Sequence, residues 1–179
     1  MIFVTVGVQL PFDRLIKAID EWTGTATGVE VIAQTGFSTY QCRNIEARPY
    51  MELASFNAFV TRAELVVAHA GMGSILTALE LGKPIIVMPR RAELGEHRND
   101  HQLSTARHMT EHGLIEVVSD EQQLIARLDD RTNLRQARNI SASANPDLIQ
   151  GLKAFIGGKP DRSLFPRFSR LLTARHHRR

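Results

Sequence analysis

Short β-branched apolar runs alternate with longer segments of helical periodicity, and this alternation is the strongest structural constraint on the chain. The runs are typical of buried strands, while the segments between them carry apolar residues three and four positions apart. Predicted strands are Ile2–Val8, Val29–Ala33, Leu65–Ala68, Pro84–Met88 and Leu114–Val118. Predicted helices start at Pro11 and at Pro49 and cover Gly71–Leu81, Asn99–Glu111 and Glu121–Leu128. This order predicts an α/β fold: a single Rossmann-like domain with a parallel sheet covered on both faces.

Length and composition limit the number of domains. Of 179 residues, 43% are apolar and 23% charged, which is typical of a globular protein with one core rather than two full domains. A glycine-rich break at Gly157 and Gly158 separates the last stretch from the rest. We therefore expect a domain over residues 1–158 and a separate terminal element over residues 159–179.

The terminal element is basic and amphipathic. It holds seven Lys and Arg residues against Asp161 alone, so the preceding part is net negative although the whole chain carries +3. This distribution disfavours nucleic-acid binding, for which a basic face on the domain is expected. Leu164, Phe165, Phe168, Leu171 and Leu172 form the apolar stripe of the predicted helix. Such a helix can dock on a partner subunit, lie on an anionic membrane surface, or pack on its own sheet.

Three features predict a cytoplasmic location. The amino-terminal residues are apolar at once and lack the basic segment of a secretory signal. No apolar run reaches the roughly 18 residues that a membrane span needs. A single cysteine, Cys42, excludes a disulfide framework and a cysteine-based zinc cluster.

The turn after the third predicted strand carries the clearest binding signal. It reads His69-Ala70-Gly71-Met72-Gly73-Ser74 and leads into a helix. Glycines let backbone N–H groups approach a ligand, and a helix N-terminus attracts anions, so the pattern predicts a phosphate site. The alternative is a tight turn that needs glycine for its own geometry. The dinucleotide and P-loop motifs do not fit, because Leu76 occupies the third glycine position and no Gly-Lys-Ser/Thr follows.

The loop after the first predicted strand is a candidate for the same crevice, because ligands of such sheets bind beyond the carboxyl ends of the strands. Gly7 permits a close approach and Gln9 offers a side-chain amide. A plain helix start is the alternative, because Pro11 suits the first position of a helix.

A long polar loop follows the fourth predicted strand. Its guanidinium groups, Arg90 and Arg91, suit a diphosphate or a carboxylate. Asn99, Asp100 and Gln102 carry amide and carboxylate groups that suit sugar hydroxyls. The alternative is a solvated loop with a helix cap.

Histidines are concentrated in the same part of the chain. His97 and His101 are four residues apart, as are His108 and His112, but no carboxylate or cysteine completes a recognised metal pattern. We therefore predict solvated helix-face histidines and no metal site. His69, at the glycine turn, can hold the backbone, contact a ligand or act as a general base.

Three segments resemble the C-terminal, donor-binding domain of family 28 glycosyltransferases. They are the opening from Phe3 to Asp13, the stretch from His69 to Pro89, and Asn99-Asp100-His101-Gln102. The likeness covers roughly residues 1–118. It is greatest to stand-alone members: the PssE-type subunits of bacterial exopolysaccharide glucuronosyltransferases, and the donor-binding subunit of the two-part eukaryotic transferase that adds the second GlcNAc to dolichol-linked sugar.

The resemblance implies the C-terminal half of a GT-B fold that binds a UDP-sugar without a metal or another cofactor. The family's diphosphate-binding turn corresponds here to Gly71, Met72, Gly73 and Ser74. The implied contacts elsewhere are Asn99, Asp100 and Gln102 for the sugar and Tyr50 and Met51 for the uracil. The chain departs from the family at Thr77, where many members have a ribose-binding Glu, with Glu80 as the next carboxylate, and at Val8, where many have Thr.

The implied function is that of the donor-binding subunit of an inverting UDP-sugar transferase. A complete enzyme of this kind needs two domains with the site between them, so a partner chain or a second copy has to supply the acceptor-binding half. We expect a membrane-anchored, acceptor-binding partner that also carries the general base. That partner would recruit the protein to the inner face of the plasma membrane. The implied acceptor is a lipid-linked saccharide, and the favoured donor is UDP-glucuronate, with Arg90 and Arg91 as its carboxylate partners.

Three other functions stay open. A UDP-GlcNAc 2-epimerase shares the GT-B architecture but needs both domains in one chain. A non-catalytic nucleotide-sugar-binding or regulatory subunit would have the same glycine turn and no turnover. A pure interaction protein would bind no nucleotide.

Overall fold

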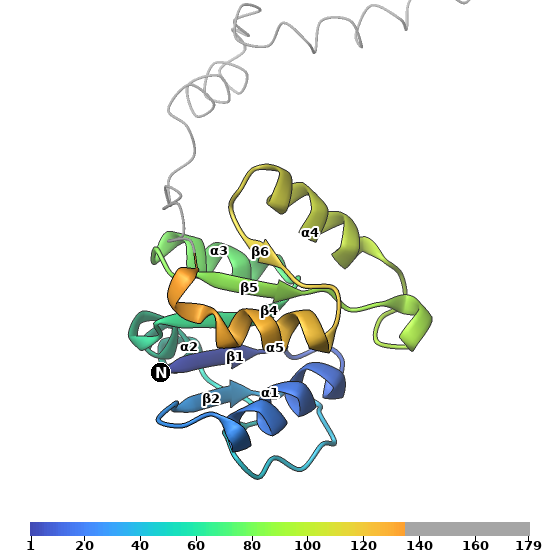
Figure 1. The fold of residues 1–179 in the computed structure, drawn as a ribbon. Coiled ribbons are helices and arrows are strands. Elements are labelled where there is room, and N and C mark those ends of the chain that lie inside the picture. Colours follow the sequence, from blue (N-terminus) through green and yellow to red (C-terminus); the bar gives the residue numbers. More distant parts are fainter. Residues whose placement is uncertain (135–179) are drawn as a thin grey trace, which may run out of the picture. The chain divides into compact units, whose positions relative to one another are not determined.

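A computed structural model of the chain describes residues 1–134, which form a six-stranded sheet with helices on both faces (Figure 1). The strands are β1 (Ile2–Thr5), β2 (Val31–Gln34), β3 (Glu46–Arg48), β4 (Leu65–His69), β5 (Ile85–Met88) and β6 (Glu116–Val117). The helices are α1 (Asp13–Thr25), α2 (Leu53–Arg62), α3 (Met72–Glu80), α4 (His101–Glu111) and α5 (Glu121–Asp129), with 3₁₀ turns η1 (Ala92–Leu94) and η2 (Arg131–Asn133). The predicted α/β fold with a parallel sheet is confirmed.

The strand order creates a place for a ligand. All five strand pairs are parallel, in the order β3-β2-β1-β4-β5-β6. The chain therefore starts at the centre of the sheet, builds outward to β3, and returns to the other side of β1 with β4. Loops after β1 and β4 leave the sheet toward opposite sides, and a crevice opens between such loops at the carboxyl ends of the strands.

Alternation along the strands gives the sheet two apolar faces. In β1, Ile2 and Val4 belong to one buried cluster and Phe3 to the other. Helices α1 and α5 cover the first face, and α2, α3 and α4 contribute to the second cluster (Figure 1). Because both faces are buried, the strands read as continuous apolar runs, as parallel strands do.

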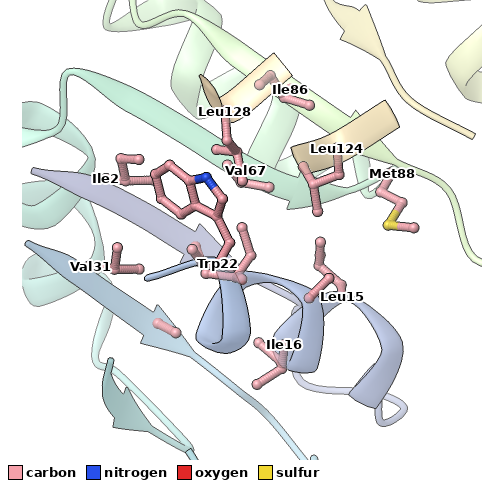
Figure 2. Packing of buried hydrophobic residues seen from close by; sticks show 14 of the residues in the cluster. Ile2, Leu15, Ile16, Trp22, Val31, Val67, Ile86, Met88, Leu124 and Leu128 are labelled. Atoms are coloured by element: carbon pink, nitrogen blue, oxygen red, sulfur yellow. The ribbon is translucent and has the colours of Figure 1, made fainter. Parts of the chain in front are cut away.

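The first cluster shows how helical spacing becomes packing. Leu15 and Trp22 of α1 and Leu124 and Leu128 of α5 meet over strand residues such as Val67 (Figure 2). Full burial of side chains of this size stabilises the fold by roughly 1.5–3 kcal/mol each.

The edges of the sheet differ most from the prediction. Strand β3 was not predicted, because its three residues are exposed and include the ion pair between Glu46 and Arg48, so no apolar pattern marks it. Helix α2 begins at Leu53 rather than at Pro49, and β1 ends at Thr5 rather than at Val8. The predicted boundary near residue 158 and the predicted terminal helix lie outside the described residues.

Helix length within residues 1–134 is modest. The longest of the described helices, α1, has 13 residues, and none of these helices is long and apolar enough to cross a bilayer.

Candidate functional site

The crevice beyond the carboxyl ends of β1, β4 and β5 has a volume of about 320 Å³. It is lined by Val6, Gly7, Val8, Gln9, His69, Ala70, Gly71, Met72, Gly73, Ser74, Arg90, His97, His101, Gln102 and Thr105. A larger hollow of about 550 Å³ lies at the amino ends of β5 and β6, near Pro84 and Glu116. We place the candidate site in the smaller crevice, because the glycine turn, the start of α3 and several polar side chains meet there.

The two glycines of the turn after β4, Gly71 and Gly73, differ in why glycine occupies the position. A Cβ atom at Gly71 would overlap Nε2 of His69, so packing alone requires glycine there. A Cβ atom at Gly73 would meet no atom within 4 Å, and Gly73 lies inside α3 with a helical backbone. Glycine in a helix costs about 1 kcal/mol relative to alanine. The fold therefore gives no reason for glycine at position 73. The missing side chain leaves the crevice open above the start of α3.

The start of α3 presents backbone donors to the same space. Gly71 is the N-cap residue, and Met72, Gly73 and Ser74 are the first helical residues. The N–H groups of a first helical turn have no carbonyl partner within the helix. They therefore offer an anion several converging donors, supported by the positive end of the helix dipole.

His69 holds two loops together. Its ring lies against Gly7, where a Cβ atom would come 2.9 Å from Cε1, and against Gly71. Gly7 also has φ +71°, which favours glycine independently. Nδ1 of His69 lies 3.5 Å from the carbonyl oxygen of Thr5. Burial, followed by the positive charge of Arg90, lowers the pKa of His69 to about 4, so the imidazole is neutral near pH 7 and is a weak base.

Arg90 is a buried cation in the wall of the crevice. Its Nη2 donates to the carbonyl oxygens of Val6 (2.7 Å) and Leu10 (2.6 Å), and its guanidinium lies 5.0 Å from the ring centroid of Phe12. Nε has no partner, and no carboxylate of the described residues forms an ion pair with Arg90. Burial lowers its pKa to about 10, so the charge remains at neutral pH. Arg90 thus fixes the loop after β1 and adds positive potential to the site.

Gln102 is anchored by one end of its amide. Its Oε1 accepts a hydrogen bond from the backbone N–H of Arg90 at 3.1 Å, and the side chain is buried. The Nε2 group makes no hydrogen bond to any of residues 1–134. A buried amide fixed in this way can donate from Nε2 to a ligand in the crevice.

The neighbouring polar residues bind their own loop. Oδ1 of Asp100 accepts from the backbone N–H of Ala92 at 2.9 Å. Asn99 contacts His101 through Oδ1, and Arg91 donates to the carbonyl oxygen of Ser119 at 2.6 Å. None of Asn99, Asp100 and Arg91 lines the crevice.

A half-buried ion pair fastens this loop to α1. Both carboxylate oxygens of Glu96 accept from Arg14, at 2.6 and 2.9 Å, and one also accepts from the backbone N–H of Arg91 at 2.9 Å. Burial alone would lower the pKa of Arg14, but the carboxylates of Glu96 and Glu121 raise it on balance. The parallel Arg–carboxylate geometry holds the loop in one position.

The crevice brings together most of the predicted donor-binding residues. Those that line it are Gly7, Gln9, His69, Gly71, Met72, Gly73, Ser74, Arg90 and Gln102. Those outside it are Tyr50, Met51, Thr77, Glu80, Asn99 and Asp100. For every one of these residues, contact with a ligand stays a prediction.

The outlying residues have identifiable surroundings. Tyr50 is exposed and Met51 buried in the segment between β3 and α2. The hydroxyl of Thr77 donates to the carbonyl oxygen of Gly73 at 2.9 Å. Glu80 ends α3, about 12 Å along the axis from its first residue. A ribose contact from Glu80 therefore has no support in this geometry.

Sequence reasoning missed three polar residues of the crevice: His97, His101 and Thr105. The two histidines were interpreted as parts of a solvated helix face. Their closeness in sequence to Gln102 was the available signal. Within residues 1–134, no group of three or more His, Cys, Asp or Glu side chains could hold a metal ion.

Comparisons with known proteins identify the family of the chain. The model of the glycosyltransferase family 28 C-terminal domain matches residues 1–153. The UDP-N-acetylglucosamine transferase subunit ALG13 of Yarrowia lipolytica is 29% identical over 123 residues, which cover 59% of this chain and 58% of that subunit. The chain thus spans little more than half the length of this relative.

Solved structures share the fold. The solution structure of ALG13 has a TM-score of 0.56 and 22% identity, and the match covers 83% of this chain and 92% of that one. The crystal structure of Acinetobacter baumannii MurG has a TM-score of 0.59 and 17% identity, covering 87% of this chain and 49% of MurG. With a family model that matches most of its length, the chain belongs to the glycosyltransferase family 28 C-terminal domain family.

Proposed function

We propose that this protein is the donor-binding subunit of an inverting UDP-sugar glycosyltransferase. The observation that carries the proposal is Gly73: neither packing nor backbone conformation requires glycine there, yet its missing side chain opens the crevice above the first turn of α3. That turn offers N–H groups to an anion the size of a diphosphate. Family membership supports a nucleotide-sugar as the ligand.

The geometry suits stabilisation of the leaving group. As the bond between the sugar and UDP breaks, negative charge grows on the diphosphate. The N–H groups of Met72, Gly73 and Ser74 and the buried charge of Arg90 are fixed in advance, and fixed dipoles of this kind lower the barrier. The acceptor hydroxyl attacks the anomeric carbon from the opposite face.

The general base is proposed to come from a partner. No Asp or Glu is among the residues that line the described crevice, and His69 is a weak base with a pKa of about 4. A membrane-anchored, acceptor-binding subunit would supply the base, present a lipid-linked saccharide and recruit this cytoplasmic protein to the inner face of the plasma membrane. The same observation leaves a non-catalytic nucleotide-sugar-binding subunit as the second candidate.

For the donor, we favour UDP-glucuronate, in exopolysaccharide or related glycan synthesis and without metal or cofactor. Two points support it: the resemblance to PssE-type subunits, and a crevice whose described lining is basic and free of carboxylates. The named activity of the relatives, transfer of N-acetylglucosamine from UDP, makes UDP-N-acetylglucosamine the competing donor.

Calorimetry on the full chain tests the binding proposal. We expect UDP to bind with a micromolar Kd and NAD not to bind. Gly73→Asp should weaken UDP at least about 100-fold, because its carboxylate would occupy the phosphate position with like charge. Its melting temperature should stay near that of the wild type, because the new side chain meets no protein atom and an acidic residue suits a first helical turn.

Gln122→Asp is the matched control, because it adds the same charge at the second residue of α5, an exposed position outside the crevice. It should leave UDP binding unchanged. NAD binding in place of UDP, or no nucleotide binding at all, would overturn the proposed function. Turnover with the partner subunit present separates the transferase from the non-catalytic candidate.

A further inference from the structure

Two histidines line the crevice along with the glycine turn. His97 precedes α4 and His101 is its first residue, and their ring centroids lie 4.5 Å apart at an interplanar angle of 82°. A second histidine pair, His108 in α4 and His112 directly after it, has nearly the same separation, 4.6 Å, but does not line the crevice. Position, rather than spacing, therefore distinguishes the first pair.

Asn99 orients both rings of the first pair. Its backbone N–H donates to Nδ1 of His97 at 3.4 Å, and its Oδ1 contacts Nδ1 of His101. Among the described residues, neither Nε2 atom has a hydrogen-bond partner. Asn99 thus occupies the Nδ1 atom of each imidazole. Nδ1 of His97 accepts, so Nε2 of His97 carries the N–H of the neutral ring. Nδ1 of His101 donates to Oδ1 of Asn99, so Nε2 of His101 is an N–H donor in the doubly protonated ring.

The backbone that carries the pair is fixed on both sides. Glu96, next to His97, binds Arg14 and a backbone N–H through both oxygens. Asp100, next to His101, accepts from the backbone N–H of Ala92. The two imidazoles are therefore held in place before any ligand arrives, which lowers the entropic cost of using them.

The charge of the crevice indicates what the pair would bind. Sugar hydroxyls are well served by carboxylate acceptors, but the described lining contains none, and Asp100 is turned into its own loop. The polar lining consists instead of Arg90, three histidines, two glutamines and hydroxyl groups. Nε2–H of His97 can donate to a carboxylate, and a doubly protonated His101 ring can donate from Nε2 while it keeps its contact with Asn99; both are charge-assisted hydrogen bonds.

From this juxtaposition, we propose that His97 and His101 form a subsite for the carboxylate of the donor sugar and select a hexuronate over a neutral hexose. Asn99 is a positioning residue that acts through both rings. The inference rests on the proposed function and refines it. It also replaces the expected carboxylate contact of Arg90 and Arg91 by a contact with the two histidines. The guanidinium groups of the two arginines already donate to carbonyl oxygens, those of Val6, Leu10 and Ser119.

The test is the ratio of the Kd values for UDP-glucose and UDP-glucuronate, measured by calorimetry on the full chain alongside the Kd for UDP. We expect the wild type to bind UDP-glucuronate about tenfold more tightly than UDP-glucose, as one charge-assisted hydrogen bond would give. The double change His97→Gln and His101→Gln should bring this ratio to about one and leave the Kd for UDP within about threefold.

Three further variants keep the test decisive. His101→Gln alone changes an exposed residue, so it should fold normally and reduce the preference in part. Asn99→Ala should reduce the preference for UDP-glucuronate without changing the Kd for UDP. A purely structural role of Asn99 would change both. His108→Gln with His112→Gln is the matched control and should leave the ratio intact.

The outcomes separate the two proposals. If the wild type binds UDP but shows no preference for the hexuronate, or if the double variant keeps the preference, the subsite is overturned and the donor site stands. If the wild type does not bind UDP, the proposed function itself fails.

Discussion

Two neighbouring loops build the crevice in opposite ways. The turn after β4 presents backbone: Gly71 makes room for His69, and Gly73 leaves open space above the first turn of α3. The loop after β5 and the start of α4 present side chains, and several of these are held by bonds of their own, such as that of Glu96 to Arg14 and that of Gln102 to the backbone of Arg90.

This difference assigns different tasks to the two loops. Backbone donors recognise a phosphate whatever sugar is attached, because every residue type supplies an N–H group. Side chains distinguish one sugar from another, because their chemistry differs from residue to residue. Changes to the backbone donors of the turn should therefore affect binding of UDP itself, while changes to side chains of the loop other than Arg90 should affect fold stability or binding of the sugar.

The largest effect is expected from His69, the residue on which the turn is packed. Its pKa, lowered to about 4 by burial and by Arg90, lies below the ordinary value of 6.5. Between these two values the unfolded chain binds a proton that the folded chain does not, so stability is full above pH 6.5 and is lost as pH falls. The loss should reach about 3 kcal/mol near pH 4.

Urea denaturation between pH 7 and pH 4 measures this dependence. His69→Asn should flatten the curve over that window, whereas His112→Asn, an exposed control on α4, should keep the wild-type slope. If the His69→Asn and wild-type curves run parallel, the partly buried imidazole does not keep its pKa low in the folded protein, and the turn does not depend on it.

The next effect belongs to the loop after β5. Glu96→Gln removes the charge that holds Arg14, and we expect a loss of about 2 kcal/mol in the free energy of unfolding. Urea denaturation at pH 7 checks this value. Glu21→Gln breaks the exposed pair with Lys17 and should change stability by less than about 0.5 kcal/mol. Equal losses in the two variants would mean that the loop is not anchored through Glu96.

The same contrast explains how far the sequence predicts this molecule. Apolar alternation predicts the strands because burial on both faces leaves a local signal, and β3 lacks that signal because Glu46 and Arg48 are exposed. The glycine turn is equally local, since all its parts lie within a few consecutive residues from His69 to Ser74.

The roles of the side chains in the loop after β5 cannot be predicted from the neighbouring residues in the sequence. Asn99 and Asp100 have the groups that suit sugar hydroxyls, but the fold directs them to His101 and Ala92. His97 fits a solvated helix face until β4 and β5 are known to be neighbours, because only that pairing brings it to the glycine turn. These choices depend on tertiary contacts, which no spacing in the sequence records.

The smallest effect is expected from Gln102. It compares the two loops through the two parts of one ligand, the sugar and the diphosphate. Its Oε1 is fixed to the backbone of Arg90, so a donor sugar would meet Nε2, while the diphosphate would meet the turn. Gln102→Ala should therefore weaken a UDP-sugar about tenfold and UDP by less than about threefold, in calorimetry on the full chain. Gln123→Ala is the matched control, because its Oε1 also accepts from a backbone N–H, that of Ser119 at 2.9 Å, outside the crevice. That control should change neither affinity. Equal weakening of UDP and UDP-sugar by Gln102→Ala would show that Gln102 supports the phosphate site, as Arg90 does, and the assignment of Gln102 to the sugar would be wrong.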